Sequence, residues 1–113
     1  MKIEQLFPIP DRRTQFAWSH HVVVPSEPGC YALATYSRDV LYVGLASRSI
    51  RDRMGVHLDT EEKRKRGNMG VPFWFVYLVC ASEEVNRLER GWMNQAILTD
   101  GDTPALNKVY SPL

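Results

Sequence analysis

The feature that most constrains the fold is an unbroken apolar run of eight residues, Phe73 to Cys80. Aromatic and β-branched residues dominate the run, which favours a strand over a helix at this length. A strand that is apolar on both faces is typical of the interior of a sheet, where neighbouring strands and covering layers exclude water. The run therefore predicts a central strand that is buried on both faces.

Two further strands and two helices are predicted around this central strand. A polar turn from Ser37 to Asp39 joins the two strands into a hairpin, and serines begin both helices as N-caps. The order β-β-α-β-α predicts an α+β domain in which helices pack on a small antiparallel or mixed sheet. The predicted bounds are about residues 30–36 and 40–44 for the hairpin strands, and about 49–58 and 82–99 for the helices.

The length and composition fit a single domain. With 113 residues and 44% hydrophobic content, the chain can bury a core without disulfides or a metal ion. Residues 1–27 are expected to form an irregular lead-in because prolines interrupt them, with Val22 to Val24 as a candidate edge strand. Cys30 and Cys80 lack the spacing of a metal or redox motif, so we expect two reduced, buried thiols.

No apolar run approaches the roughly 20 residues that span a bilayer. Glu4 and the lack of an extended apolar stretch argue against a signal peptide at the start of the chain. We therefore expect a cytoplasmic protein with no membrane partner.

Basic residues gather in one part of the chain. The whole chain has a net charge of +1, whereas residues 48–66 contain seven basic and four acidic side chains. Such a patch attracts a phosphate backbone, although a solvated charged face explains the same composition. The candidate nucleic-acid contacts are Arg48, Arg51, Lys63, Arg64, Lys65 and Arg66.

Glu89 occupies an unusual position in the second predicted helix. On a helical wheel with about 100° per residue it falls between Ala96 and Met93, within an apolar stripe. A carboxylate in such a stripe is costly unless a cation, a metal ion or a proton neutralises it. Glu89 is therefore a candidate metal ligand, and a salt bridge to an arginine or a place at the open end of the stripe is the structural alternative.

Arg53 and His57 are four residues apart in the first predicted helix, so their side chains lie one above the other beside its apolar stripe. An arginine that binds phosphate, next to a histidine that carries protons, suits phosphodiester cleavage. The same pair also occurs at the edge of ordinary amphipathic helices.

Two tyrosines and one asparagine complete the candidate residues. Tyr31 and Tyr42 are predicted on the two hairpin strands, and the register decides whether their phenols share a face. Both are otherwise ordinary strand residues, because a phenol with a reference pKa of about 10 is a poor base unless a cation lowers it. The amide of Asn107 could hold a backbone group or orient a phosphate.

Taken in order, these residues resemble the signature of the GIY-YIG nuclease superfamily. The resemblance covers residues 28–108. Cysteine stands where the family usually has isoleucine, but Cys30 alternates with Tyr31 along the strand and is expected to face away from the chemistry. The matching positions are Gly29-Cys30-Tyr31, Tyr42-Val43-Gly44 after ten intervening residues, Arg53, His57, Glu89 and Asn107.

The resemblance implies a three-stranded antiparallel sheet flanked by helices, and a metal-dependent endonuclease that hydrolyses DNA phosphodiester bonds. It implies one Mg²⁺ ion, which Mn²⁺ could replace, held by Glu89 together with waters and phosphate oxygens. The roles that the resemblance assigns are general base for Tyr31, orientation of the water or phosphate for Tyr42, charge neutralisation for Arg53, proton transfer for His57 and support of the site for Asn107.

Two other functions are considered beside the endonuclease. A nucleic-acid-binding module on the same fold would have lost catalysis, yet it would have no reason to keep Glu89 in an apolar stripe. An interaction protein that uses exposed aromatic side chains would leave the site residues as coincidences. DNA is the expected partner, and specificity is expected to come from the lead-in, from the basic residues Lys63 to Arg66, from a homodimer or from a partner protein.

Overall fold

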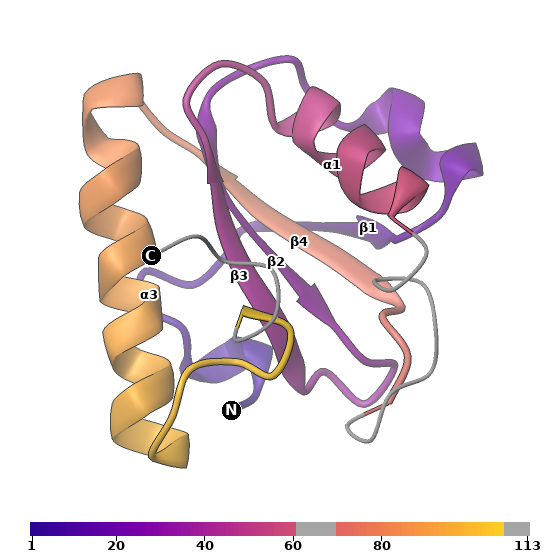
Figure 1. The fold of residues 1–113 in the computed structure, drawn as a ribbon. Coiled ribbons are helices and arrows are strands. Elements are labelled where there is room, and N and C mark those ends of the chain that lie inside the picture. The colour runs from indigo at the N-terminus through magenta and orange to yellow at the C-terminus, as the bar shows by residue number, and fades with distance from the viewer. Residues whose placement is uncertain (61–69, 108–113) are drawn as a thin grey trace.

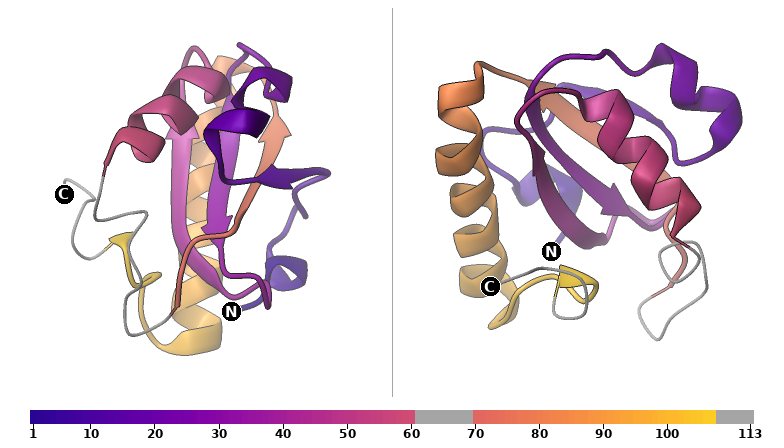
Figure 2. Two further views of the ribbon diagram at one scale, coloured as in Figure 1. Left: turned by 90° about the vertical axis from the view of Figure 1, so that its right-hand side faces the viewer. Right: turned by 45° about the horizontal axis from the view of Figure 1, so that its top comes forward.

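The computed structural model describes residues 1–60 and 70–107, and its centre is a four-stranded antiparallel sheet (Figure 1). The elements are β1 (Arg12–Gln15), β2 (Gly29–Ala34), β3 (Val40–Ala46), α1 (Ile50–Asp59), β4 (Trp74–Val79) and α3 (Val85–Asp100). The strands lie in the order β1-β4-β2-β3. Helices α1 and α3 cover opposite faces of the sheet, so the domain has three layers (Figure 2).

The apolar run forms a central strand, which confirms the sequence prediction. β4 pairs with β1 on one side and with β2 on the other, and its residues Phe75 to Tyr77 are buried. The predicted hairpin is also confirmed, because β2 pairs antiparallel with β3 across a short turn. Arg38 adopts a φ of 75° in that turn.

The prediction of a three-stranded sheet is wrong by one strand. β1 lies inside the segment that was expected to be irregular, and it pairs with β4 at the edge of the sheet. Its side chains are polar and mostly exposed, so no apolar alternation marks it in the sequence. Backbone pairing holds it, together with the Arg13 guanidinium, whose carbon lies 4.4 Å from the centroid of the Trp74 ring. The candidate strand at Val22 to Val24 is instead the end of a 3-10 helix, Trp18–Val23, that packs on α1.

Each face of the sheet carries its own hydrophobic cluster. Side chains alternate along β2, so Tyr31 and Leu33 pack on the α1 side, whereas Cys30 and Ala32 pack on the α3 side. This confirms that Cys30 faces away from Tyr31. Burial and the nearby Cys80 raise the pKa of the Cys30 thiol to about 12, and both cysteines are free. Cys30 is buried as predicted, whereas Cys80 is only partly buried, so the prediction is wrong for Cys80.

Both predicted helices are present, and each has an identifiable start and end. The hydroxyl of Ser49 accepts a hydrogen bond of 3.1 Å from the backbone N–H of Asp52 and so caps α1. The segment Ser82–Glu84 forms a 3-10 turn, and the α-helix α3 begins only after it. Gly101 ends α3 with a φ of 81°, a conformation that glycine adopts without strain. Within the part of the chain that the structure describes, no helix is both long and apolar enough to cross a membrane.

Trp92 connects α3 to the sheet and to the N-terminal segment, because its ring is fully buried and its N–H donates a 2.9 Å hydrogen bond to the carbonyl of Pro8. We expect Trp92→Ala to lower the free energy of unfolding by about 3–5 kcal/mol, measured by urea denaturation. Leu98→Ala on the same helix is the control. Leu98 is 86% exposed, so its loss should change the free energy by no more than about 0.5 kcal/mol. Similar effects for the two variants would contradict the packing described here.

Candidate active site

The centre of the site is a hydrogen bond between two fully buried side chains, Tyr31 on β2 and His57 on α1. The hydroxyl oxygen of Tyr31 and Nε2 of His57 are 2.6 Å apart. Tyr42 on β3 completes the group, with its ring centroid 6.3 Å from that of Tyr31 and 5.0 Å from that of His57. The structure therefore brings three of the six predicted site residues together on the α1 face.

Gly44 makes this arrangement possible. It lies opposite Tyr31 in the β2–β3 pairing, and a Cβ at position 44 would be 2.5 Å from the hydroxyl oxygen of Tyr31. The Tyr31 ring therefore lies across a stretch of β3 backbone where only a hydrogen atom fits. Gly29 is equally constrained, because a Cβ there would be 2.3 Å from the carbonyl oxygen of Leu78. Both glycines lie in strands. Because they have no side chain, another part of the chain can lie close to the strand backbone at these two positions.

Arg53 lies one helical turn before His57, and its side chain is exposed. Burial raises the pKa of the Tyr31 phenol, and the neighbouring Tyr42 adds to this shift, whereas the charge of Arg53 opposes it. Burial likewise raises the pKa of Tyr42, again opposed by Arg53. The pKa of the Arg53 guanidinium is raised in turn, and Tyr31 is the largest cause of that shift. Both phenols are therefore neutral near neutral pH, and Tyr31 can act as a base only if another group takes its proton.

Glu89 lies on α3, which packs against β3 and covers the face of the sheet opposite to α1 (Figure 1). The side chain is half-buried, and this burial raises the pKa of its carboxyl group while Arg90 opposes the shift. No hydrogen bond or salt bridge reaches the Glu89 carboxylate from residues 1–60 or 70–107. Its charge also raises the pKa of Tyr31 and of Tyr42, so it acts on the same phenols as Arg53.

The environment of Glu89 fits a hard divalent cation. Burial of this carboxylate outweighs the charge of Arg90 and costs free energy, and a bound cation would reduce that cost. Among the described residues, no group of three or more His, Cys, Asp or Glu side chains is placed to hold a metal ion. A cation at Glu89 would therefore have one carboxylate ligand from these residues, an arrangement that Mg²⁺ accepts because it keeps several waters.

Asn107 holds a backbone group, which decides between the two roles that the sequence left open. Its Oδ1 accepts a 2.8 Å hydrogen bond from the N–H of Val43, and its Nδ2 donates one of 2.8 Å to the Val43 carbonyl. The neighbouring Leu106 N–H donates a further 2.8 Å bond to the carbonyl of Leu41. This segment therefore pairs with the free edge of β3 and fixes the strand on both sides of Tyr42.

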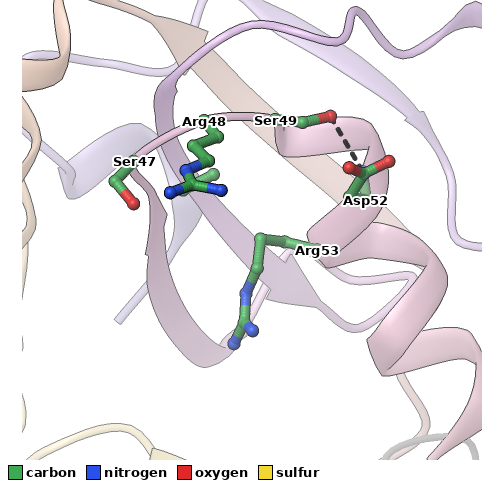
Figure 3. Close-up of a pocket in the computed structure, with 6 residues that line it drawn as sticks. Ser47, Arg48, Ser49, Asp52 and Arg53 are labelled. Carbon is green, nitrogen blue, oxygen red and sulfur yellow. Dashed lines mark hydrogen bonds between the residues drawn. The ribbon is translucent and has the colours of Figure 1, made fainter.

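The basic residues predicted to contact nucleic acid differ in their surroundings. Arg51 serves the fold, because its Nε donates a 2.6 Å hydrogen bond to the carbonyl of Val24. Arg48 is exposed and lines a pocket of about 210 Å³ together with Ser47 and Arg53 (Figure 3). Four further candidates lie outside the described residues, namely Lys63, Arg64, Lys65 and Arg66.

No protein-family model and no curated protein matches the chain. The resemblance to the GIY-YIG nucleases therefore stays a prediction from the sequence.

Gly44→Ala tests the close approach of Tyr31 to β3. The added methyl group should displace the phenol from His57 and lower the free energy of unfolding by about 1–3 kcal/mol. Gly91→Ala is a matched control, because nothing lies within 4 Å of a Cβ at that helical position. It should stabilise α3 by about 0.5–1 kcal/mol. Urea denaturation measures both changes, and an equal gain in stability for the two variants would refute the close approach.

Glu89 predicts a dependence of stability on pH. Because burial raises the pKa of its carboxyl group above the ordinary 4.5, the folded protein binds this proton more tightly than the unfolded chain does. The free energy of unfolding of the wild type should therefore fall, relative to Glu89→Gln, as the pH rises from about 4.5 through the raised pKa. Urea denaturation of both proteins across this range measures the difference. Glu83→Gln removes an exposed carboxylate just before α3 and serves as the control. A difference between wild type and Glu89→Gln that did not change with pH would contradict the burial of Glu89.

Proposed function

We propose that the chain is a divalent-metal-dependent endonuclease that hydrolyses DNA phosphodiester bonds, like the GIY-YIG nucleases that its sequence resembles. The observation that carries the proposal is the 2.6 Å contact between Tyr31 and His57, with the charges of Arg53 and Glu89 acting on the same phenol. Phosphodiester hydrolysis needs a proton acceptor, a cation for the phosphate and a ligand for a metal ion. Tyr31 and His57 supply the proton acceptor, Arg53 supplies the cation, and Glu89 supplies the ligand.

In the proposed reaction, Tyr31 relays a proton from the attacking water to His57. Burial keeps the phenol protonated, so it gives its proton to Nε2 of His57 while its oxygen accepts one from the water. The resulting hydroxide forms a bond to phosphorus, and the bond between phosphorus and the 3′ oxygen breaks. The 3′ oxygen takes a proton from solvent water as it leaves, so the products carry a 5′-phosphate and a 3′-hydroxyl group.

Arg53 is the exposed member of the group, so it meets the phosphate before the buried residues do. Its guanidinium can donate two parallel hydrogen bonds to phosphate oxygens and neutralise the charge that grows on them. Tyr42, which is 6% exposed, lies beside Tyr31 and His57 and orients the water or the phosphate.

Glu89 is the residue that would hold the metal ion, Mg²⁺ or Mn²⁺. When bound, such an ion supplies Lewis-acid stabilisation of the negative charge on the phosphate and the leaving oxygen. The contribution of Glu89 is a half-buried carboxylate that the surrounding residues leave poorly neutralised. DNA is the proposed partner, and a homodimer or a second protein would add specificity.

A nucleic-acid-binding module without catalysis is the second candidate function. The observation that favours it is the complete burial of Tyr31 and His57, which keeps water from the proposed base in the absence of a substrate. Such a module would bind DNA with a strong dependence on salt and would not cut it.

Cleavage of supercoiled plasmid in Mg²⁺ or in EDTA separates the two candidates. The wild type should nick or linearise the plasmid in Mg²⁺ alone, and Glu89→Gln should abolish cutting while leaving the protein folded. Tyr31→Phe should lower the rate about 10²- to 10⁴-fold, because it removes the proton relay. Tyr36→Phe removes a hydroxyl from a 72% exposed tyrosine outside the site and should cut like the wild type. Salt-dependent DNA binding by a folded wild type that never cuts would establish the binding module instead.

A further inference from the structure

A pocket of about 210 Å³ opens between the end of β3 and the start of α1 (Figure 3). Two arginines and one carboxylate line it, so its charged side chains carry a net positive charge. In Figure 3 the side chains of Arg48 and Arg53 extend to the same side of the connecting loop, whereas Asp52 lies toward the Ser49 cap. The lining residues are Ala46, Ser47, Arg48, Ser49, Asp52 and Arg53.

Arg48 has no structural task among the residues that the structure describes. Its side chain is exposed, and no hydrogen bond or salt bridge joins it to residues 1–60 or 70–107. Some other arginines of the chain have such partners. Arg51 donates to the carbonyl of Val24, and Arg38 forms a 2.7 Å salt bridge with Glu4. The guanidinium of Arg48 is therefore available for a ligand in the pocket.

Arg53 links the pocket to the candidate active site. The same side chain lines the pocket and changes the pKa of Tyr31 and Tyr42. A group in the pocket would therefore neighbour a phosphate bound at the phenols. Nucleic acid offers phosphates in close succession, since each strand of a duplex carries one phosphate for about every 3.4 Å of helix axis.

We propose that this pocket binds the phosphate next to the scissile phosphate on the same nucleic-acid strand. The inference rests on the proposed function, since it names the second contact of that substrate. Arg48 binds the phosphate that does not react, while Arg53 serves the one that does. Contacts to two successive phosphates set the register of the strand without reading its bases. The substrate is therefore a polynucleotide that is held by its backbone, and sequence selectivity at this site is weak.

The test uses three variants and a substrate fragment that remains uncut. In the Glu89→Gln background, NMR would follow the backbone amides of residues 46–53 during titration with inorganic phosphate. A second titration would use a DNA trinucleotide with two phosphates, and the same trinucleotide with either phosphate replaced by a neutral methylphosphonate. The variants are Arg48→Gln, Asp52→Asn and, as a matched control, Arg12→Gln. Arg12 is an exposed arginine on β1, at the opposite edge of the sheet from β3.

Inorganic phosphate should shift the amides of residues 46–53, and Arg48→Gln should weaken its binding about three- to tenfold. Asp52→Asn should strengthen binding because it removes the carboxylate from the pocket, and Arg12→Gln should match the parent protein. Replacing the phosphate that Arg48 binds should weaken binding of the trinucleotide to the parent protein. The same replacement should not further weaken its binding to Arg48→Gln. Equal affinities in the parent and in Arg48→Gln would overturn the assignment.

The same proteins with Glu89 restored distinguish failure of the pocket from failure of the enzyme. Arg48→Gln should raise KM for plasmid cleavage and leave kcat nearly unchanged, because it contacts a phosphate that does not react. Phosphate binding that depends on Arg48, without cleavage by the wild type, would disprove the endonuclease and keep the phosphate site. Cleavage with an unchanged KM in Arg48→Gln would disprove the phosphate site and keep the endonuclease.

Discussion

The site depends on one close contact, in which the phenol ring of Tyr31 crosses the backbone of β3 at a residue without a side chain. Tyr31 reaches His57 because Gly44 leaves space above β3 for the ring, and the β2–β3 register places these two residues opposite each other. The register is fixed in turn because a slip of one residue would move every side chain of β2 to the other face of the sheet. One local requirement, a missing Cβ, thus ties the pairing of the strands to the position of α1.

Two charges act in opposite directions on the pKa of the buried Tyr31 phenol. Arg53 favours the ionised form of Tyr31, while burial and Glu89 favour the protonated form. A phosphate that engages Arg53 would remove the stabilising charge, and the pKa of the phenol would rise further. Neutralising Glu89, with a proton or a cation, has the reverse effect. In the proposed enzyme, a cation bound at Glu89 would therefore offset the rise in the pKa of Tyr31 that the substrate causes.

The elements that the sequence predicts well are those specified by local patterns. The apolar run gives β4, the polar turn gives the hairpin, and Ser49 and Gly101 mark a helix start and a helix end. β1 could not be predicted, because its polar residues form a strand only through pairing with a segment more than 50 residues away. Within the site, the residue types were predictable, but the burial of Tyr31 and the partner of Asn107 depend on the packing of distant segments.

The position of Asn107 limits what this residue can contribute to chemistry. Its amide already makes two hydrogen bonds to the backbone of Val43, and the side chain is only 4% exposed. Binding a phosphate would require it to give up bonds whose loss leaves buried polar groups unsatisfied. β3 is an edge strand, and this pairing protects part of its free edge. Asn107 is therefore a positioning residue, which acts on the site by holding the strand that carries Tyr42 and Gly44.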